Sequence, residues 1–190
     1  GGVLSLSGGA IMSNQLVQGE AIEGRLAFAA AEHQHFGLAT DFNDDNATVW
    51  AIFSTLGTSD RLFARVFVRG TMTNVDLGPL PSGFHDYRIQ PASGAIQFLV
   101  DGVVLTTIAA TLPADAPIRA AVSNFAGAAT QVDRIRTVAF NTTGTFTSSI
   151  LDAGAIAAWG EASWTADLPA GTSILIETQS SIDGETWSGW

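Results

Sequence analysis

The chain contains no cysteine and no lysine, and each absence narrows what the protein can be. Because disulfides are excluded, stability must come from a buried core, which 190 residues with 46% hydrophobic residues can supply. All eight basic residues are arginines, and eighteen acidic residues bring the net charge at pH 7 to −10. We therefore expect neither a nucleic acid nor an anionic membrane surface as a partner.

Long apolar runs and helical periodicity are also missing. No stretch approaches the roughly 18 consecutive apolar residues of a membrane-spanning helix, so we expect no membrane insertion. Instead, segments rich in Val, Ile, Phe and Thr recur roughly every 8 to 14 residues between turn-forming residues, which predicts an all-β sandwich. The expected strands are 3–7, 10–13, 20–29, 33–40, 47–53, 61–69, 71–77, 84–90, 95–100, 103–109, 119–125 and 131–140.

The clearest local pattern lies between residues 84 and 105. In segment 84–90, His85, Tyr87 and Ile89 alternate with polar residues, and segment 95–100 likewise places its Ile, Phe and Val on one face. An Asp-Gly turn at 101–102 then leads into a further apolar run. This pattern predicts three consecutive antiparallel strands.

This aromatic-His-x-Tyr-x-Ile strand, followed by Ile-x-Phe-x-Val-Asp-Gly, resembles the signature hairpin of concanavalin A-like (laminin G-like) jelly-roll domains. The resemblance covers about residues 1–140 and implies an antiparallel β-sandwich. Such domains occur as lectins, as glucanases and as spacers in secreted bacterial multidomain proteins, so the resemblance implies a secreted or cell-surface protein. The fold is shared by these classes and does not choose between them.

A change of composition near residues 141–145 marks a boundary, because every arginine lies before it and only acidic charges follow. We expect a jelly-roll domain over 1–140, and over 141–190 a linker and a short β appendage that resembles the start of a second β-sandwich module. Its tryptophans should dominate the packing of this appendage; they are Trp159, Trp164, Trp187 and Trp190. The sequence begins on a predicted strand and ends in the middle of a strand-like pattern. We therefore expect a piece of a longer polypeptide, or a missing strand that a neighbouring chain supplies.

Glycosidases of the concanavalin A-like class use two carboxylates at alternate positions of one strand, so that both reach the same cleft. The nearest acidic pairs, Glu20 with Glu23 and Asp44 with Asp45, have spacings that place their members on opposite faces of a strand. No nucleophile elbow, phosphate-binding loop or dinucleotide motif occurs either. The sequence therefore predicts a protein that is not an enzyme.

Two groups of residues could bind a metal or a ligand hydroxyl. His33 and His35 are two residues apart, so on a strand both imidazoles would face the same side, although two polar residues on a sheet face is the alternative. Asp41, Asn43 and Asp45 match the opening of a calcium loop, while the rest of that loop does not fit and an ordinary turn also explains them. Calcium is thus a possible cofactor, and no other is expected.

The segment 61–69 is more suggestive, because aliphatic residues alternate there with aromatic residues and arginines. Its aliphatic face should belong to the core. The opposite face, extended by a tryptophan on a nearby strand, suits stacking on sugar rings and hydrogen bonding to their hydroxyls. The residues of this predicted platform are Trp50, Phe63, Arg65, Phe67 and Arg69. The alternative is that the C-terminal segment or another subunit covers them.

Together these features predict a non-catalytic extracellular module for adhesion, which binds a polysaccharide, a cell-surface glycan or another surface. The alternative is a structural subunit of an extracellular assembly or filament. In that case the edge strands and the tryptophan-rich C-terminal segment would contact other copies of the chain, and no small ligand would be needed.

Overall fold

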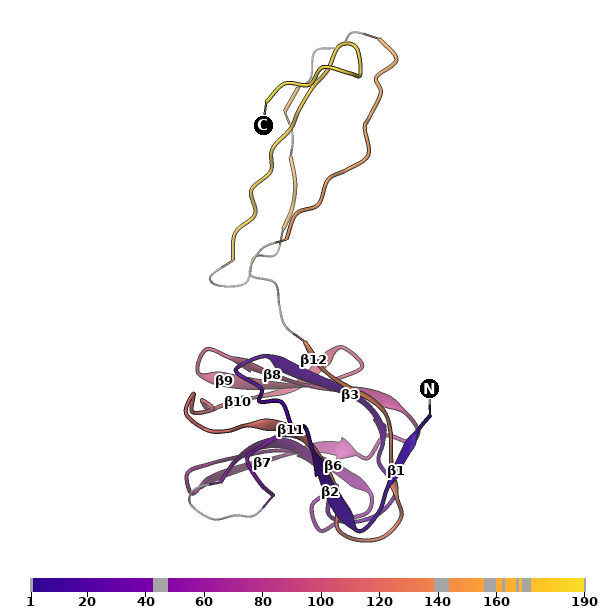
Figure 1. The fold of residues 1–190 in the computed structure, drawn as a ribbon, viewed down its shortest axis with the longest axis vertical. Helices are drawn as coiled ribbons and strands as arrows, with labels where there is room; N and C mark the ends of the chain where they lie inside the picture. The colour runs from indigo at the N-terminus through magenta and orange to yellow at the C-terminus, as the bar shows by residue number, and fades with distance from the viewer. Residues whose placement is uncertain are drawn as a thin grey trace. The chain divides into compact units, whose positions relative to one another are not determined.

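The computed structural model describes residues 2–42, 48–138, 144–155, 160–161, 163–166, 168 and 172–189. The chain divides into two compact units, Gly1–Thr142 and Thr143–Trp190 (Figure 1). All twelve assigned strands belong to the first unit. Among the described residues there is no helix long and apolar enough to cross a membrane.

Each strand expected from the sequence is present, with its ends within about two residues of the expected positions. The strands are β1 (Leu4–Leu6), β2 (Gly9–Met12), β3 (Ala21–Ala27), β4 (Gln34–Ala39), β5 (Val49–Ser54), β6 (Arg61–Val68), β7 (Thr71–Pro79), β8 (His85–Ala92), β9 (Ala95–Val100), β10 (Val103–Ala109), β11 (Arg119–Asn124) and β12 (Thr130–Val138). Burial alternates along strands such as β3, β8 and β9, as expected when one face of a strand packs on the core, whereas β4 and β5 are buried at every position.

The strands form two six-stranded antiparallel sheets, which lie face to face as the two layers of a sandwich (Figure 1). One sheet has the order β1-β12-β3-β8-β9-β10 and the other has the order β2-β11-β4-β5-β6-β7. The main hydrophobic core draws residues from both sheets. The predicted all-β sandwich is confirmed, including the aliphatic face of β6, where Leu62, Ala64 and Val66 are buried in this core.

Aromatic rings fill the centre of the core. Phe53 of β5 makes edge-to-face contacts with Tyr87 of β8 and Phe98 of β9, with ring centroids 5.2 Å apart in both pairs. Phe28 contacts Tyr87 in the same way at 5.1 Å. Because each such side chain removes a large apolar area from water, the contacts of Phe53 with the two rings of the opposite sheet hold the sandwich together.

The predicted turn at 101–102 is present between β9 and β10. Asp101 and Gly102 both have positive φ, at 51° and 80°, as a two-residue hairpin turn requires. The Asp101 carboxylate accepts hydrogen bonds from the Asp86 backbone N–H at 2.9 Å and pairs with His85 Nδ1 at 2.6 Å. The Asp101 hydrogen bond, helped by the Ser82 carbonyl, raises the pKa of His85 above its ordinary value.

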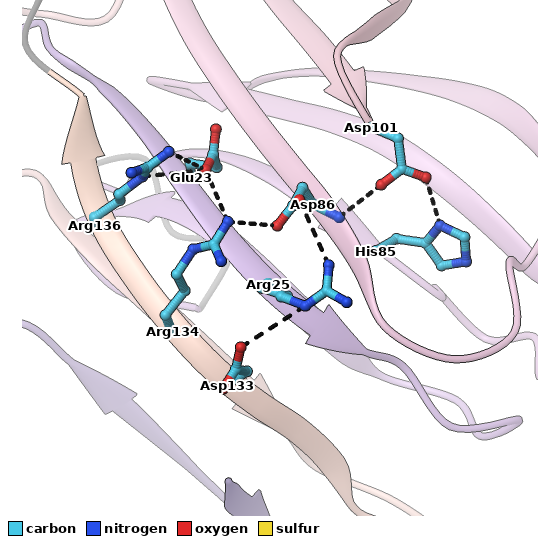
Figure 2. Close-up of polar contacts among 8 residues, drawn as sticks. All are labelled: Glu23, Arg25, His85, Asp86, Asp101, Asp133, Arg134 and Arg136. Carbon is cyan, nitrogen blue, oxygen red and sulfur yellow. Dashed lines mark hydrogen bonds and ion pairs between the residues drawn. The ribbon is translucent and has the colours of Figure 1, made fainter. Parts of the chain in front are cut away.

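Charged side chains cover the outer face of β12, β3 and β8 as one connected network (Figure 2). Its ion pairs are Arg136–Glu23 at 2.7 Å, Arg134–Glu23 at 3.4 Å, Arg134–Asp86 at 2.9 Å, Arg25–Asp86 at 3.6 Å and Arg25–Asp133 at 3.8 Å. Each exposed pair contributes little stability alone. The network nevertheless engages three of the arginines with the protein's own carboxylates.

The second unit differs from the expectation, because its described residues contain no assigned strand. The predicted C-terminal β appendage is therefore not found there. Local order is seen around Asp183, whose carboxylate accepts the backbone N–H groups of Glu185 and Thr186. Trp164 and Trp187 are exposed, while Trp159 and Trp190 lie outside the described residues.

The Tyr87 hydroxyl gives a test of the core. It is fully buried and has no hydrogen-bond partner among the described residues. Because an unpartnered buried hydroxyl costs about 1–3 kcal/mol, we expect Tyr87→Phe to leave the free energy of unfolding unchanged or to raise it by about 1 kcal/mol. The matched control Phe53→Ala should lower it by about 3–5 kcal/mol. Urea unfolding measures both variants, and a clear loss in Tyr87→Phe would show that the hydroxyl is bonded in solution.

Candidate functional site

The outer face of β4, β5, β6 and β11 carries a second, smaller apolar cluster, separate from the main core. A sheet face turned toward water is normally polar. Here strand alternation instead places apolar side chains on it, and Phe42 from the loop after β4 packs against them. The buried members are Ala39, Trp50, Ile52, Phe67 and Ala121. An apolar cluster on the outer face of a sheet is a candidate binding surface.

Trp50 and Phe67 are the centre of this cluster. They lie directly opposite each other on β5 and β6, and their rings stack with centroids 5.4 Å apart. Only 2% of Trp50 and 4% of Phe67 are exposed. The Arg65 guanidinium lies 4.9 Å from the Trp50 ring centre, and its Nε donates to Asn74 Oδ1 at 2.8 Å. The aromatic rings of Trp50 and Phe67 and the Arg65 guanidinium therefore cover one another instead of forming an open platform, and ligand binding by the predicted residues stays a prediction.

Two further residues of the predicted platform lie elsewhere. Phe63 is half-buried and pairs across the sheet with Ser54 and Asp76, near the start of β6. Arg69 follows the end of β6 and has φ of 47°, so it belongs to the turn before β7 rather than to the sheet face. Its guanidinium is bound to the carboxylate of Asp115 at 3.0 Å. Neither side chain lines the pocket described next.

A pocket of about 280 Å³ opens beside Trp50. It is lined by His33, His35, Phe42, Trp50, Ile52, Leu56 and Arg65. The structure thus brings together both predicted histidines, Trp50 and Arg65. Ile52 could have been found from the sequence, because it is two residues from Trp50 on the same strand. Phe42 and Leu56 come from loops and had no comparable signal.

His35 lies on the wall of this pocket and is only 8% exposed. Its Nδ1 is 2.7 Å from the Oγ of Ser123, its cross-strand neighbour on β11. Burial, together with the positive charges of Arg65 and His33, lowers the pKa of His35 to about 3. The imidazole ring is consequently neutral near pH 7, and the rings of Phe42 and Phe125 flank it at 5.7 and 6.0 Å.

The rim of the pocket has an uncommon backbone conformation. His33 and Leu56 both have positive φ, at 53° and 51°, and the N–H of His33 donates to the Leu56 carbonyl at 2.7 Å. Such non-glycine residues cost about 1–3 kcal/mol and persist only where surrounding structure enforces them. The sequence predicted that His33 lies on the strand, whereas it directly precedes β4. Both histidines nevertheless line the same pocket.

Two predictions about polar groups have different outcomes. Of the calcium-loop candidates, Asp41 is described, whereas Asn43 and Asp45 lie outside the described residues. In the described part of the chain no group of three or more His, Asp or Glu side chains could hold a metal ion, so His33 and His35 lack a third ligand there. None of the twelve strands contains two acidic residues. The paired carboxylates of a glycosidase strand are thus missing from all of them.

The buried histidine predicts a pH dependence of stability. Between its ordinary pKa near 6.5 and its folded value of about 3, the unfolded chain binds a proton that the folded chain does not. Stability should therefore fall as the pH is lowered through this window, by at most about 1.4 kcal/mol for each pH unit.

Urea unfolding at several pH values between about 4 and 7 tests this expectation. His35→Gln cannot titrate, so its stability should depend less steeply on pH than that of the parent chain. Equal slopes in the two proteins would show that His35 does not remain neutral in the folded state.

No family model matches the sequence, and no curated protein is similar to it at the sequence level. Several solved structures share its fold. A glycoside hydrolase family protein from Mycobacterium thermorestibile is 18% identical, with a TM-score of 0.54 over 72% of this chain and 75% of that one. The Bacillus licheniformis β-glucanase is 16% identical, with a TM-score of 0.54 over 73% and 78%.

An immunostimulatory antigen of Mycobacterium tuberculosis, described as a pseudo β-1,3-glucanase, is also similar. It is 16% identical, with a TM-score of 0.53 over 73% of this chain and 75% of that one. Identities at this level indicate a shared fold and nothing finer. The first unit of this chain is a concanavalin A-like jelly-roll β-sandwich of the type found in glucanases.

Proposed function

We propose that the first unit is a non-catalytic extracellular module that binds a carbohydrate, of a polysaccharide or of a cell-surface glycan, in the pocket beside Trp50. The observation that carries the proposal is the composition of this pocket. Aromatic rings of Phe42 and Trp50 lie beside the nitrogen-bearing rings of His33 and His35. Sugars present apolar ring faces and hydroxyl groups together, so they match an apolar concavity that holds a few placed polar groups.

The absence of catalysis is supported by the strands themselves. A retaining or inverting glycosidase needs two carboxyl groups on either side of the scissile bond. None of the twelve strands supplies such a pair, and among the residues that the structure describes no acidic side chain lines the pocket. The extracellular location is supported by the resemblance of residues 84–102 to domains of secreted proteins.

Glycan binding can be tested with an array of immobilised glycans, followed by calorimetry on the strongest ligand. Phe42 reaches the pocket from a loop, so Phe42→Ala should weaken binding about tenfold, equivalent to about 1.4 kcal/mol, without loss of the sandwich. Arg69→Ala is the matched control, because this exposed turn residue does not line the pocket. An array without any ligand, or equal losses in both variants, would contradict the proposal.

A second candidate function, a subunit of an extracellular assembly, is favoured by the edge strand β10. This strand carries no charged residue, and Val103, Val104 and Leu105 are all exposed. Natural edge strands are commonly protected by charges or proline, because an unprotected edge can pair with another chain. Pairing with a second copy of β10 would extend the sheet β1-β12-β3-β8-β9-β10.

Light scattering distinguishes the two functions. A binding module should be a monomer close to the chain mass of 19.8 kDa, with or without added calcium. An assembly subunit should form larger particles, and Val104→Lys should dissociate them by placing a charge on the edge. Ser93→Lys, in the exposed turn between β8 and β9, is the control and should leave the particle mass unchanged. Particles that Val104→Lys dissociates would favour assembly over the binding module.

A further inference from the structure

The pair formed by His35 and Ser123 restricts what the pocket can bind. The two residues face each other on β4 and β11, and Nδ1 and Oγ are 2.7 Å apart. Two arrangements of hydrogens fit this distance. Either the serine hydroxyl donates to Nδ1, or a protonated Nδ1 donates to the serine oxygen.

Burial of Ser123 decides between them. The residue is 0% exposed, and within the described part of the chain its Oγ has His35 Nδ1 as its one hydrogen-bond partner. A buried hydroxyl hydrogen that is not donated costs free energy, and Nδ1 is the acceptor available to it. The hydroxyl therefore donates, and the neutral imidazole carries its own hydrogen on Nε2.

The position of Ser123 also fixes where Nε2 points. Ser123 lies on β11, on one side of β4, whereas Trp50, Ile52 and Arg65 lie on β5 and β6, on the other side. With Nδ1 held toward β11, the rest of the imidazole ring extends over the pocket. Among the described residues Nε2 has no hydrogen-bond partner, and it is not one of the buried polar atoms that lack one, so it lies where the pocket opens to solvent. The Nε2–H of His35 is thus an oriented hydrogen-bond donor that an acceptor atom of a ligand could use.

Size and charge limit the ligand further. A volume of about 280 Å³ lies at the lower end of the roughly 300–1,000 Å³ usual for ligand pockets, which suits a ligand of about the size of one sugar ring. The His35 ring is neutral, and the Arg65 guanidinium is engaged by Trp50, Asn74 and Met72. The neutral His35 donor and the rings of Phe42 and Trp50 are the contacts of this pocket that suit an uncharged ligand.

We infer that the pocket holds a single neutral pyranose at the end of a glycan chain and that the Nε2–H of His35 donates a hydrogen bond to one of its oxygens. Ser123 is a positioning residue, because it fixes the tautomer and orientation of His35 without touching the ligand. This inference rests on the proposed function, and it adds that chain ends, rather than internal segments, are bound.

The tautomer can be tested without any ligand, by ¹⁵N-detected NMR of the histidine side chains in the full chain. We expect His35 to show a protonated Nε2 and an unprotonated Nδ1. In Ser123→Ala this preference should be lost or reversed, while Ser93→Ala, in an exposed turn, should leave it unchanged. A protonated Nδ1 in the parent chain would overturn the inference and leave the proposed glycan binding intact.

Ligand binding is tested with three probes, methyl β-D-glucopyranoside, laminaritriose and glucuronic acid. We expect the neutral glucoside to shift the Nε2 resonance of His35, and laminaritriose to bind within about threefold of it, since only one terminal ring enters the pocket. Glucuronic acid should bind no more tightly than the glucoside, and Ser123→Ala should weaken the glucoside about tenfold.

The possible results distinguish a failure of this inference from a failure of the proposed function. Laminaritriose bound more than tenfold tighter than the glucoside, or a preference for glucuronic acid, would overturn the inference while supporting glycan binding. No response to any neutral probe, combined with ligands on the glycan array, would also overturn the inference alone. An array without ligands would overturn the proposed function and the inference that rests on it.

Discussion

The buried side-chain amide of Gln34 is the interaction on which the pocket depends. The side chain is fully buried, and both its oxygen and its nitrogen make two hydrogen bonds. Its Oε1 accepts from the Ala29 N–H at 2.9 Å and from the Thr130 hydroxyl at 2.7 Å, and its Nε2 donates to the carbonyls of Ala29 and Ala31 at 2.7 Å. Since Thr130 belongs to β12, one amide joins the two sheets and the loop that carries His33. Leaving any of these groups unpaired would cost about 1–3 kcal/mol.

The hydrogen bonds of Gln34 also fix the position of its neighbour His35, because successive side chains of a strand point to opposite faces. Gln34 points into the core, so His35 points to the outer face, where it lines the pocket. Gly37 continues this face of β4, and a Cβ atom there would lie 2.2 Å from the Ala51 carbonyl oxygen. The absence of a side chain at this position lets β4 and β5 approach closely. The rigid core thus fixes the spacing between His35 and the β5 residues, which a pocket for one small ligand requires.

Alternation of side chains and turn-forming residues were enough to predict the twelve strands, the turn at Asp101 and the core face of β6 from the sequence. It was insufficient where the answer depends on register between distant strands. The direct pairing of Trp50 with Phe67 buries both rings, and no local pattern reveals which residue of β6 faces Trp50. The contact of His35 with Ser123 joins residues 88 positions apart, so it too follows only from the assembled sheet. Which residues meet at the candidate site therefore depends on cross-strand pairing more than on the strand propensity of each residue.

The two outer faces of the sandwich differ in what contact with another molecule would cost. On β12, β3 and β8 a partner would have to displace water from a network of arginines and carboxylates, and burying such charges is unfavourable unless new pairs replace those lost (Figure 2). On β4, β5 and β6 the apolar cluster around Trp50 and Phe67 is closely packed, and His35 adds an Nε2 that has no partner among the described residues. A ligand bound there would displace few charges and would gain a hydrogen bond from His35. The net charge of −10 repels anionic molecules at long range, which agrees with the neutral ligand that we infer.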